Sequence, residues 1–405
     1  MKQRGKDDLL PLGFKAAAVS SGIKKNKKND LGLIYSIVPA QTIVLFTQNC
    51  LQGVHIIIDR QKLKQNLAQA IIVNSGNANC ATGAAGILAA ERVMAKIARE
   101  LDISKDLVLI ASTGVIGKKF PEHKICLKCR TLAERLDYNV RSLAEALMTT
   151  DTFSKVSSLE LNLGGEKVKI TGIAKGAGMI FPNMRESKVA HATMLCFLMT
   201  DANVALQTLK QVLTYAVNRS FNLINVDGDM SPNDSVFFLA NGLSANRKIL
   251  TRARDFNKFK YAVTSVCVEL AKMIVCDAEG ATKFVEIIVK GTRSETEAKT
   301  IANAISRSLL VKTMFYGADP NWGRVISAAG ASGVKFYPEK CTLSINNHMA
   351  FSYGQAAKGI EKIRITMKKN REQKIVLDLH CGRSAACVWT ADLSTEYVKI
   401  NSSYT

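Results

Sequence analysis

The sequence predicts an α/β fold in which layered, mixed β-sheets pack against helices, and two patterns support this prediction. Short apolar segments typical of buried strands recur along the 405 residues. The segments between them place apolar residues at helical spacing, and this alternation is typical of α/β layers. Because 47% of the residues are apolar, the chain can bury two cores. We expect a larger domain over residues 1–276 and a smaller one over residues 277–405.

Buried strands are predicted where apolar residues form short runs bounded by polar turns. In chain order these runs are Leu31–Val38, Thr42–Phe46, His55–Ile58, Ala70–Val73, Leu107–Ile110, Val168–Ala174 and Val285–Gly291. Helices are predicted where apolar residues follow one face of a 3.6-residue period, as Ile87, Val93 and Ile97 do. These segments are Ala84–Leu101, Cys129–Leu147, Thr208–Asn218, Phe259–Cys276 and Glu295–Leu309.

The net charge of +21 would favour anionic partners if the basic residues gathered on one face. The densest runs, Lys24–Lys28 and Lys368–Lys374, are short and lack interleaved aromatic residues, so we expect a solvated surface and no nucleic-acid binding.

No apolar run approaches the length of about 18 residues that a membrane span needs. Asp7 and Asp8 interrupt the position of a signal peptide. We therefore expect a cytoplasmic protein without membrane contact.

The cysteine and aspartate patterns do not predict a metal or another cofactor. Ten cysteines are too sparse for a disulfide scaffold. Cys126 and Cys129 form a CxxC pair after His123 that could be half of a metal site, but no second pair follows it, so structural thiols are favoured. The acidic segment 227–235, DGDMSPNDS, could suggest a hard-cation site, but a solvated turn is favoured.

Segments rich in glycine and asparagine follow several predicted strands, where backbone N–H groups can face a ligand. In STGVIG (112–117), the Thr113 hydroxyl and the Gly114 N–H could donate two hydrogen bonds to a developing oxyanion. Lys175 stands beside two glycines in KGAGMIFPNM (175–184), where its charge could neutralise a substrate carboxylate. The alternatives are a plain turn at the first segment and a surface lysine at the second.

Taken in order, the motifs resemble those of the bifunctional ornithine acetyltransferase / glutamate N-acetyltransferase family of arginine biosynthesis. The collinear matches cover nearly the whole chain. They are GFKAAAVSSGIK (13–24), NSGNANCATG (74–83), STGVIG, MTTDTFSK (148–155), KGAGMI, ATML (192–195), DGDMSPNDS, DAEGATKF (277–284), KTMFYGADPNWGR (312–324) and YVKINSSYT (397–405).

The resemblance implies a self-processing enzyme with an N-terminal threonine nucleophile. Family members cut their own chain before a threonine, and the matching bond joins Ala192 to Thr193. A polar segment switches to an apolar one at this point. Since a threonine hydroxyl is a weak nucleophile, a free α-amine with a pKa of about 7.7–8.0 on the same residue can serve as its base. Cleavage would therefore create the catalytic group as well as expose it.

The resemblance also implies a ping-pong acetyl transfer without a cofactor. An acetyl group would pass from N2-acetyl-L-ornithine to Thr193 and then to L-glutamate, and some relatives also use acetyl-CoA. Thr113 and Gly114 match the oxyanion-stabilising pair. The residues that match substrate-binding positions are Thr152, Lys175, Thr193, Glu279, Asn401 and Thr405. The processed fragments would assemble into a heterotetramer.

The sequence departs from the family pattern in places. Residues 185–191 are inserted before Ala192, the chain is one residue shorter after Asn401, and Met230 and Ala278 replace a threonine and a glycine. Two alternatives to the acetyltransferase remain open. One is an unprocessed, weakly active relative that binds a ligand or a partner protein. The other is an N-terminal-nucleophile amidohydrolase, which would use water as the acyl acceptor.

Overall fold

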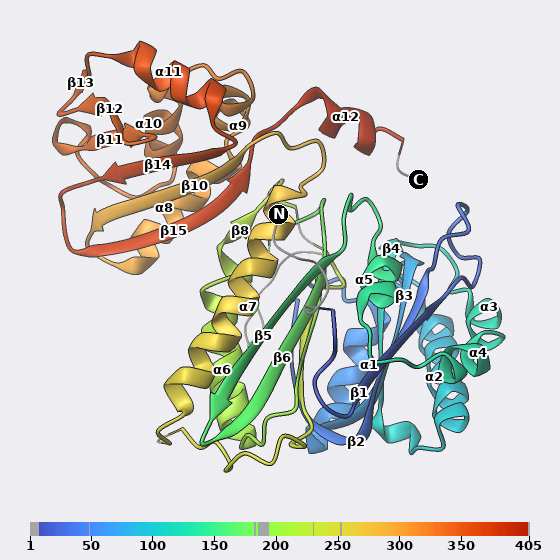
Figure 1. The fold of residues 1–405 in the computed structure, drawn as a ribbon. Helices are drawn as coiled ribbons and strands as arrows, with labels where there is room; N and C mark the ends of the chain where they lie inside the picture. Colours follow the sequence, from blue (N-terminus) through green and yellow to red (C-terminus); the bar gives the residue numbers. More distant parts are fainter. Residues whose placement is uncertain are drawn as a thin grey trace. The chain divides into compact units, whose positions relative to one another are not determined.

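The computed structural model describes residues 8–47, 49–181, 184, 194–229, 231–251 and 253–403. The chain divides into two compact units, each built around its own β-sheet (Figure 1). Unit 1 comprises Met1–Asn222 and Asp229–Ile274, and unit 2 comprises Leu223–Gly228 and Val275–Thr405. The predicted α/β class is confirmed.

Unit 1 is built on an eight-stranded mixed sheet of strand order β4-β3-β2-β9-β7-β6-β5, with β1 paired to β2. The β3–β4 and β7–β9 pairs are parallel, and the other pairs are antiparallel. The strands are β1 (Phe14–Val19), β2 (Leu31–Phe46), β3 (Leu67–Asn77), β4 (Val108–Val115), β5 (Lys155–Leu163), β6 (Glu166–Lys175), β7 (Leu195–Thr200) and β9 (Ser235–Ala240). The helices are α1 (Val54–Lys62), α2 (Gly83–Leu101), α3 (Glu122–Cys126), α4 (Cys129–Glu134), α5 (Arg141–Leu147), α6 (Leu206–Asn218) and α7 (Phe256–Cys276).

The two faces of this sheet are both buried, because successive strand residues point to opposite sides. Ile71 of β3 packs in the same apolar cluster as Leu143 of α5, whereas its neighbour Ile72 packs in the cluster that holds Val93 of α2. Strands buried on both faces read as continuous apolar runs. This is why β3, β4 and β7 are apolar without alternation.

Unit 2 is built on a seven-stranded mixed sheet of order β13-β12-β11-β14-β10-β15-β8. Its strands are β8 (Ile224–Asn225), β10 (Phe284–Thr292), β11 (Thr342–Ile345), β12 (His348–Ser352), β13 (Gln355–Ala356), β14 (Glu372–Asp378) and β15 (Ser384–Ala391). Its helices are α8 (Glu295–Arg307), α9 (Leu309–Tyr316), α10 (Trp322–Gly330), α11 (Ile360–Lys369) and α12 (Thr395–Asn401). Ile287, Ile301 and Val325 belong to one apolar core, so β10, α8 and α10 pack together.

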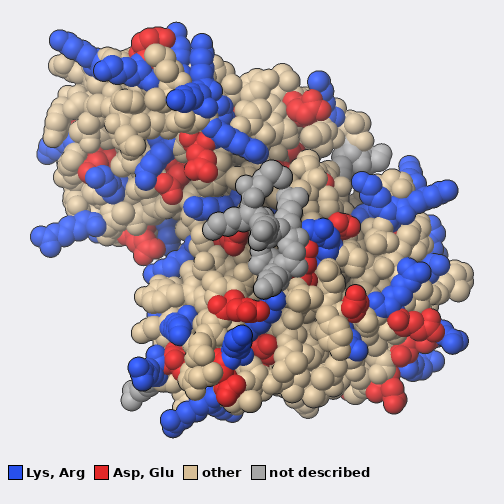
Figure 2. All heavy atoms as spheres, viewed as in Figure 1, with Lys and Arg blue, Asp and Glu red and all other residues tan. Residues whose placement is uncertain are grey.

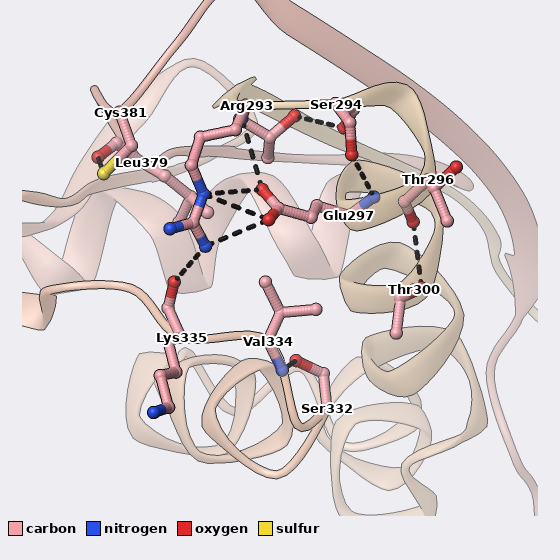
Figure 3. A network of polar contacts seen from close by, with 11 residues as sticks. Arg293, Ser294, Thr296, Glu297, Thr300, Ser332, Val334, Lys335, Leu379 and Cys381 are labelled. Atoms are coloured by element: carbon pink, nitrogen blue, oxygen red, sulfur yellow. Dashed lines mark hydrogen bonds and ion pairs between the residues drawn. The ribbon is translucent and has the colours of Figure 1, made fainter.

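Polar contacts at the start of α8 tie it to the segment after α10 (Figure 3). The Ser294 hydroxyl caps the helix by accepting a hydrogen bond from the Glu297 N–H at 3.2 Å. Arg293 forms an ion pair with Glu297 at 2.9 Å and donates to the Lys335 carbonyl at 2.9 Å. These bonds join the end of β10 to the loop that follows α10.

The structure corrects several sequence predictions. The strand predicted at His55–Ile58 is wrong, since these residues lie in helix α1. A short apolar run is compatible with either a buried strand or a buried helix, so periodicity alone cannot distinguish them. The two strands predicted in 31–46 are one strand, β2, with a register shift between Tyr35 and Ala40. The helix predicted over 129–147 is two helices, α4 and α5. The helix predicted over 295–309 ends at Arg307, because Ser308 caps the next helix, α9.

One face of the described part of the chain shows the dispersed charges that the sequence predicts (Figure 2). On the face drawn in Figure 2, Lys and Arg are spread over both units with Asp and Glu between them. None of the helices in the described ranges combines the length and apolarity required to cross a membrane.

Candidate active site

Thr113 and Gly114 lie near the end of β4, where it runs parallel to β3. Gly114 is the register partner of Gly76, next to a bulge between Gly76 and Asn77. A Cβ at Gly114 would lie 2.4 Å from the Gly76 carbonyl carbon, and Gly114 has φ = 131°. Only glycine fits this close approach of two backbones. The predicted oxyanion pair is therefore held on a constrained strand end rather than on a free turn.

A buried polar network stabilises this strand end. The Ser112 hydroxyl donates to Asn74 Oδ1 at 2.7 Å, which links the side chains of β4 and β3. The Asn233 amide donates to the carbonyls of Ala78 at 2.6 Å and Ser112 at 2.7 Å. All of these side chains are buried. The network leaves little freedom for the backbone that carries Thr113.

Lys175, the last residue of β6, brings a buried cation to Thr113. Its side chain is 4% exposed, and its Nζ lies 3.4 Å from Thr113 Oγ1. The same Nζ lies 4.0 Å from Asp151 Oδ2. Two residues that the sequence predicts for the site, 62 positions apart, are thus neighbours within unit 1.

Asp151 connects Lys175 to a second buried lysine. Its carboxylate accepts hydrogen bonds from Lys155 Nζ at 2.7 Å, from the Gly176 N–H at 2.7 Å and from the Thr149 N–H at 3.0 Å. Burial alone would raise the pKa of Asp151. The charges of Lys175 and Lys155, together with the hydrogen bonds from Lys155 and Gly176, outweigh burial and hold the pKa well below its usual range. Asp151 is therefore ionised at neutral pH.

The strand after the predicted nucleophile lies beside β6. Ala192 and Thr193 lie outside the described residues, as does Thr405. Leu195 begins β7 and is the register partner of Lys175, and the Met194 carbonyl accepts from the Ser235 N–H at 3.0 Å. Thr193 is therefore two residues along the chain from the partner of Lys175. Thr152 is exposed in the loop between α5 and β5, directly after Asp151.

Asp234, directly before β9, is a buried carboxyl group in the segment that the sequence predicts as a solvated turn. It is fully buried, and neither carboxyl oxygen has a hydrogen bond of normal geometry within the described residues. Burial raises the pKa of Asp234 well above its usual range, against the opposing effects of the Met194 N–H and the Lys175 charge. The predicted solvated turn at 227–235 is wrong for its second half, because Ser231, Asn233 and Asp234 are buried.

Glu279 and Asn401, both in unit 2, are also brought together. Asn401, the last residue of α12, donates from Nδ2 to Glu279 Oε2 at 2.7 Å. Asp392 accepts from the N–H groups of Thr282 and Lys283 at 2.8 Å each. These bonds hold the loop that carries the Glu279 carboxylate.

Other candidate features contribute no chemistry to these clusters. Burial raises the pKa of Cys129 to about 12 and also raises that of Cys126, so both are protonated thiols. No group of three or more metal-binding side chains occurs in the described parts of the chain. A cavity of about 920 Å³, formed by α1, α2 and the segment before β4, contains Lys62 and Lys105 but none of the predicted site residues.

Comparisons with known proteins match nearly the whole length of the chain. The sequence profile of the ArgJ family matches residues 15–405. The arginine biosynthesis bifunctional protein ArgJ of Thermotoga neapolitana is 42% identical over 402 residues, which cover 98% of this chain and 99% of that protein. The ArgJ protein of Listeria monocytogenes serotype 4b is 41% identical over 395 residues, 97% of each chain.

A solved structure is similar to part of the chain. The ArgJ crystal structure from Bacillus halodurans has 38% sequence identity and a TM-score of 0.50. The match covers 98% of that chain but 51% of this one. The solved chain thus corresponds to about half of the present sequence.

Proposed function

The chain belongs to the ArgJ family of bifunctional arginine-biosynthesis proteins, and from this premise we propose that it is an acetyltransferase that moves an acetyl group from N2-acetyl-L-ornithine to L-glutamate. The residues proposed to stabilise the transition state are Thr113 and Gly114. The observation that supports this most directly is the 3.4 Å contact between Lys175 and Thr113, because it joins a buried cation to an oxyanion donor.

In the first half-reaction, the free α-amine of Thr193 accepts the hydroxyl proton while the hydroxyl oxygen attacks the acetyl carbonyl carbon. The negative charge that develops on the carbonyl oxygen accepts hydrogen bonds from the Thr113 hydroxyl and the Gly114 N–H. The bond between the acetyl carbon and N2 of ornithine then breaks, and the Thr193 ammonium returns its proton to that nitrogen. Acetyl-threonine and ornithine are the products.

In the second half-reaction, the neutral amine of glutamate attacks the acetyl-threonine carbonyl and passes its proton to the Thr193 α-amine. The ester bond breaks, and that proton returns to the threonine oxygen. Lys175 binds a substrate carboxylate, and Glu279, oriented by Asn401, binds an amine. Thr152 and Thr405 complete the proposed substrate contacts.

Self-cleavage between Ala192 and Thr193 is the step that supplies the α-amine. The half-length coverage of the Bacillus halodurans chain supports this proposal, because residues 193–405 also make up about half of the sequence. We propose that the two fragments stay associated as a heterotetramer in the cytoplasm, and that acetyl-CoA is a further donor.

Mass spectrometry and a transfer assay test this function together. The purified protein should give fragments ending at Ala192 and starting at Thr193, and [acetyl-¹³C]-N2-acetylornithine should transfer its label to glutamate. Label released only as free acetate would identify a hydrolase instead. An uncut chain without transfer would overturn the proposal and would leave the unprocessed, ligand-binding relative as the alternative.

A further inference from the structure

Lys24 stands beside the Thr113–Lys175 site, although no role for it followed from the sequence. We propose that Lys24 is a second substrate-binding cation of this site and that it binds the side-chain carboxylate of glutamate. This inference rests on the proposed function and deepens it, since it assigns the residue that distinguishes the acyl acceptor from ornithine.

The turn that carries Lys24 is held in place by one buried carboxylate. Asp30 accepts hydrogen bonds from the N–H groups of Ile23 at 2.7 Å and Lys24 at 2.9 Å. It also accepts from the Ser21 N–H at 2.6 Å and the Ser21 hydroxyl at 2.7 Å. Asp30 is fully buried. The Lys24 backbone therefore has a defined position despite the exposed residues Lys25–Lys28 that follow it.

The Lys24 side chain lies next to Gly76, near the end of β3. A Cβ placed on Gly76 would lie 3.4 Å from Lys24 Cγ and 3.0 Å from Ile23 Cγ2. Gly76 is also the register partner of Gly114. Gly76 therefore lies next to both the Lys24 side chain and Gly114, which belongs to the predicted oxyanion pair.

The Lys24 ammonium is in contact with two backbone carbonyls. Its Nζ donates to the Ala146 carbonyl at 3.0 Å and to the Asn29 carbonyl at 3.1 Å. An ammonium has three protons, so one remains for a ligand. No carboxylate lies within ion-pair distance of Lys24 among the described residues, and a bound carboxylate would supply the missing countercharge.

The electrostatics agree with this geometry. Burial lowers the pKa of Lys24 to about 8, although Asp30 opposes the shift. The charge of Lys175 lowers this pKa further, Asp151 raises it, and Lys28 has a small lowering effect. Two ammonium groups that repel each other across one site favour an anion between or beside them.

The charges of the two substrates favour a second cation for glutamate. Ornithine has one carboxylate, whereas glutamate has two. Asp151 and Lys155 neutralise each other at 2.7 Å, so Lys175 alone leaves one carboxylate of glutamate without a cation. Lys24 fills that deficit, and it has little to bind in N2-acetylornithine.

The test measures both substrates in wild type and Lys24→Met, which keeps the apolar stem over Gly76. The KM for glutamate should rise about 10–100-fold, and the KM for N2-acetylornithine should change less than about threefold. Lys24→Arg should recover most of the glutamate affinity. Lys25→Met, an exposed neighbour in the same loop, should behave as wild type.

The pH profile gives a readout that a purely structural role would not change. The ratio of glutamate kcat/KM in wild type to that in Lys24→Met should fall as pH rises through about 8, because Lys24 loses its proton there, whereas deprotonation of the glutamate amine and of the Thr193 α-amine affects both proteins alike. Lys24→Arg should keep its advantage over Lys24→Met to higher pH. Equal effects of Lys24→Met on both substrates, or an unchanged KM for glutamate, would overturn the role of Lys24 while wild-type transfer keeps the proposed function. Wild-type protein without transfer would overturn both.

Discussion

Asp151 and Lys155 form an ion pair with 2.7 Å between Oδ1 and Nζ, and neither side chain is exposed to solvent. Two buried charges offset the cost of their desolvation only while both are present. The pair lies beside Lys175, whose Nζ is 4.0 Å from the same carboxylate. A charge that stabilises the fold is therefore also part of the electrostatic environment of the site.

Removing one partner of this pair should be strongly destabilising. Lys155→Met leaves Asp151 with Lys175 as its remaining ammonium, and we expect a loss of about 3–5 kcal/mol in the free energy of unfolding. Urea denaturation measures this change. Arg130→Met breaks the exposed Arg130–Glu134 pair and should cost less than about 1 kcal/mol. Similar losses of unfolding free energy in the two variants would contradict the claim that burial makes the Asp151–Lys155 pair more important for stability than an exposed pair.

Asp234 and Asp151 should give opposite pH dependences of stability. The folded-state pKa of Asp151 is lowered, so its contribution is present above the unfolded pKa and is lost as pH falls through the folded pKa. The folded-state pKa of Asp234 is raised, so its contribution is present below the unfolded pKa of about 3.9 and is lost as pH rises above it.

Asp234→Asn should therefore gain stability relative to the parent as pH rises. The difference in unfolding free energy between the two proteins should be smallest near pH 4 and should grow toward pH 7. Urea denaturation series at several pH values measure it. A difference that is independent of pH would mean that Asp234 does not have a raised pKa in the folded protein.

Features that depend on local sequence patterns could be predicted, whereas features that depend on tertiary contacts could not. Helix α2 was predicted within one residue of its start, because its apolar face repeats over 19 residues. The positions of Thr113, Lys175 and Glu279 followed from motifs. The burial of Asp234 was not predicted, because it results from the pairing of β7 with β9, and the chain between those strands contains helix α6. The closeness of Lys24 to Gly76 is likewise a tertiary contact, and no local sequence pattern predicts it.

Thr113 should act on the transition state rather than on substrate binding. Thr113→Ala should lower kcat about 10²–10³-fold in processed protein, with little change in KM, because it removes one oxyanion donor. Thr113→Ser keeps the hydroxyl and should recover much of the rate. Steady-state kinetics with N2-acetylornithine and glutamate measure both variants. A raised KM at unchanged kcat would make Thr113 a binding residue instead.

The segment 185–191, which lies outside the described residues, should affect the rate of self-cleavage. Deleting it joins Met184 to Ala192 and restores the family spacing. Since cleavage needs the Thr193 hydroxyl held against the Ala192 carbonyl, a shorter connection should speed the appearance of the two fragments. Gel densitometry over time measures this rate. A deletion variant that folds but cuts no faster would show that the insertion is an adapted part of the site.

The Asn401–Glu279 contact should govern amine recognition. The 2.7 Å hydrogen bond from Asn401 Nδ2 orients the Glu279 carboxylate, and Asn401 is exposed at the end of α12. Asn401→Ala should therefore raise the KM for N2-acetylornithine about tenfold with little change in melting temperature. Ser402→Ala, whose hydroxyl donates to the Lys399 carbonyl, is the matched control in the same turn and should leave KM unchanged. If Asn401→Ala lowers kcat and KM together, or if both variants behave alike, then orientation of Glu279 by Asn401 does not control binding. The loop that carries Glu279 would then be positioned by its other bonds, which include those accepted by Asp392 and the one from the Ser394 hydroxyl to the Gly280 carbonyl.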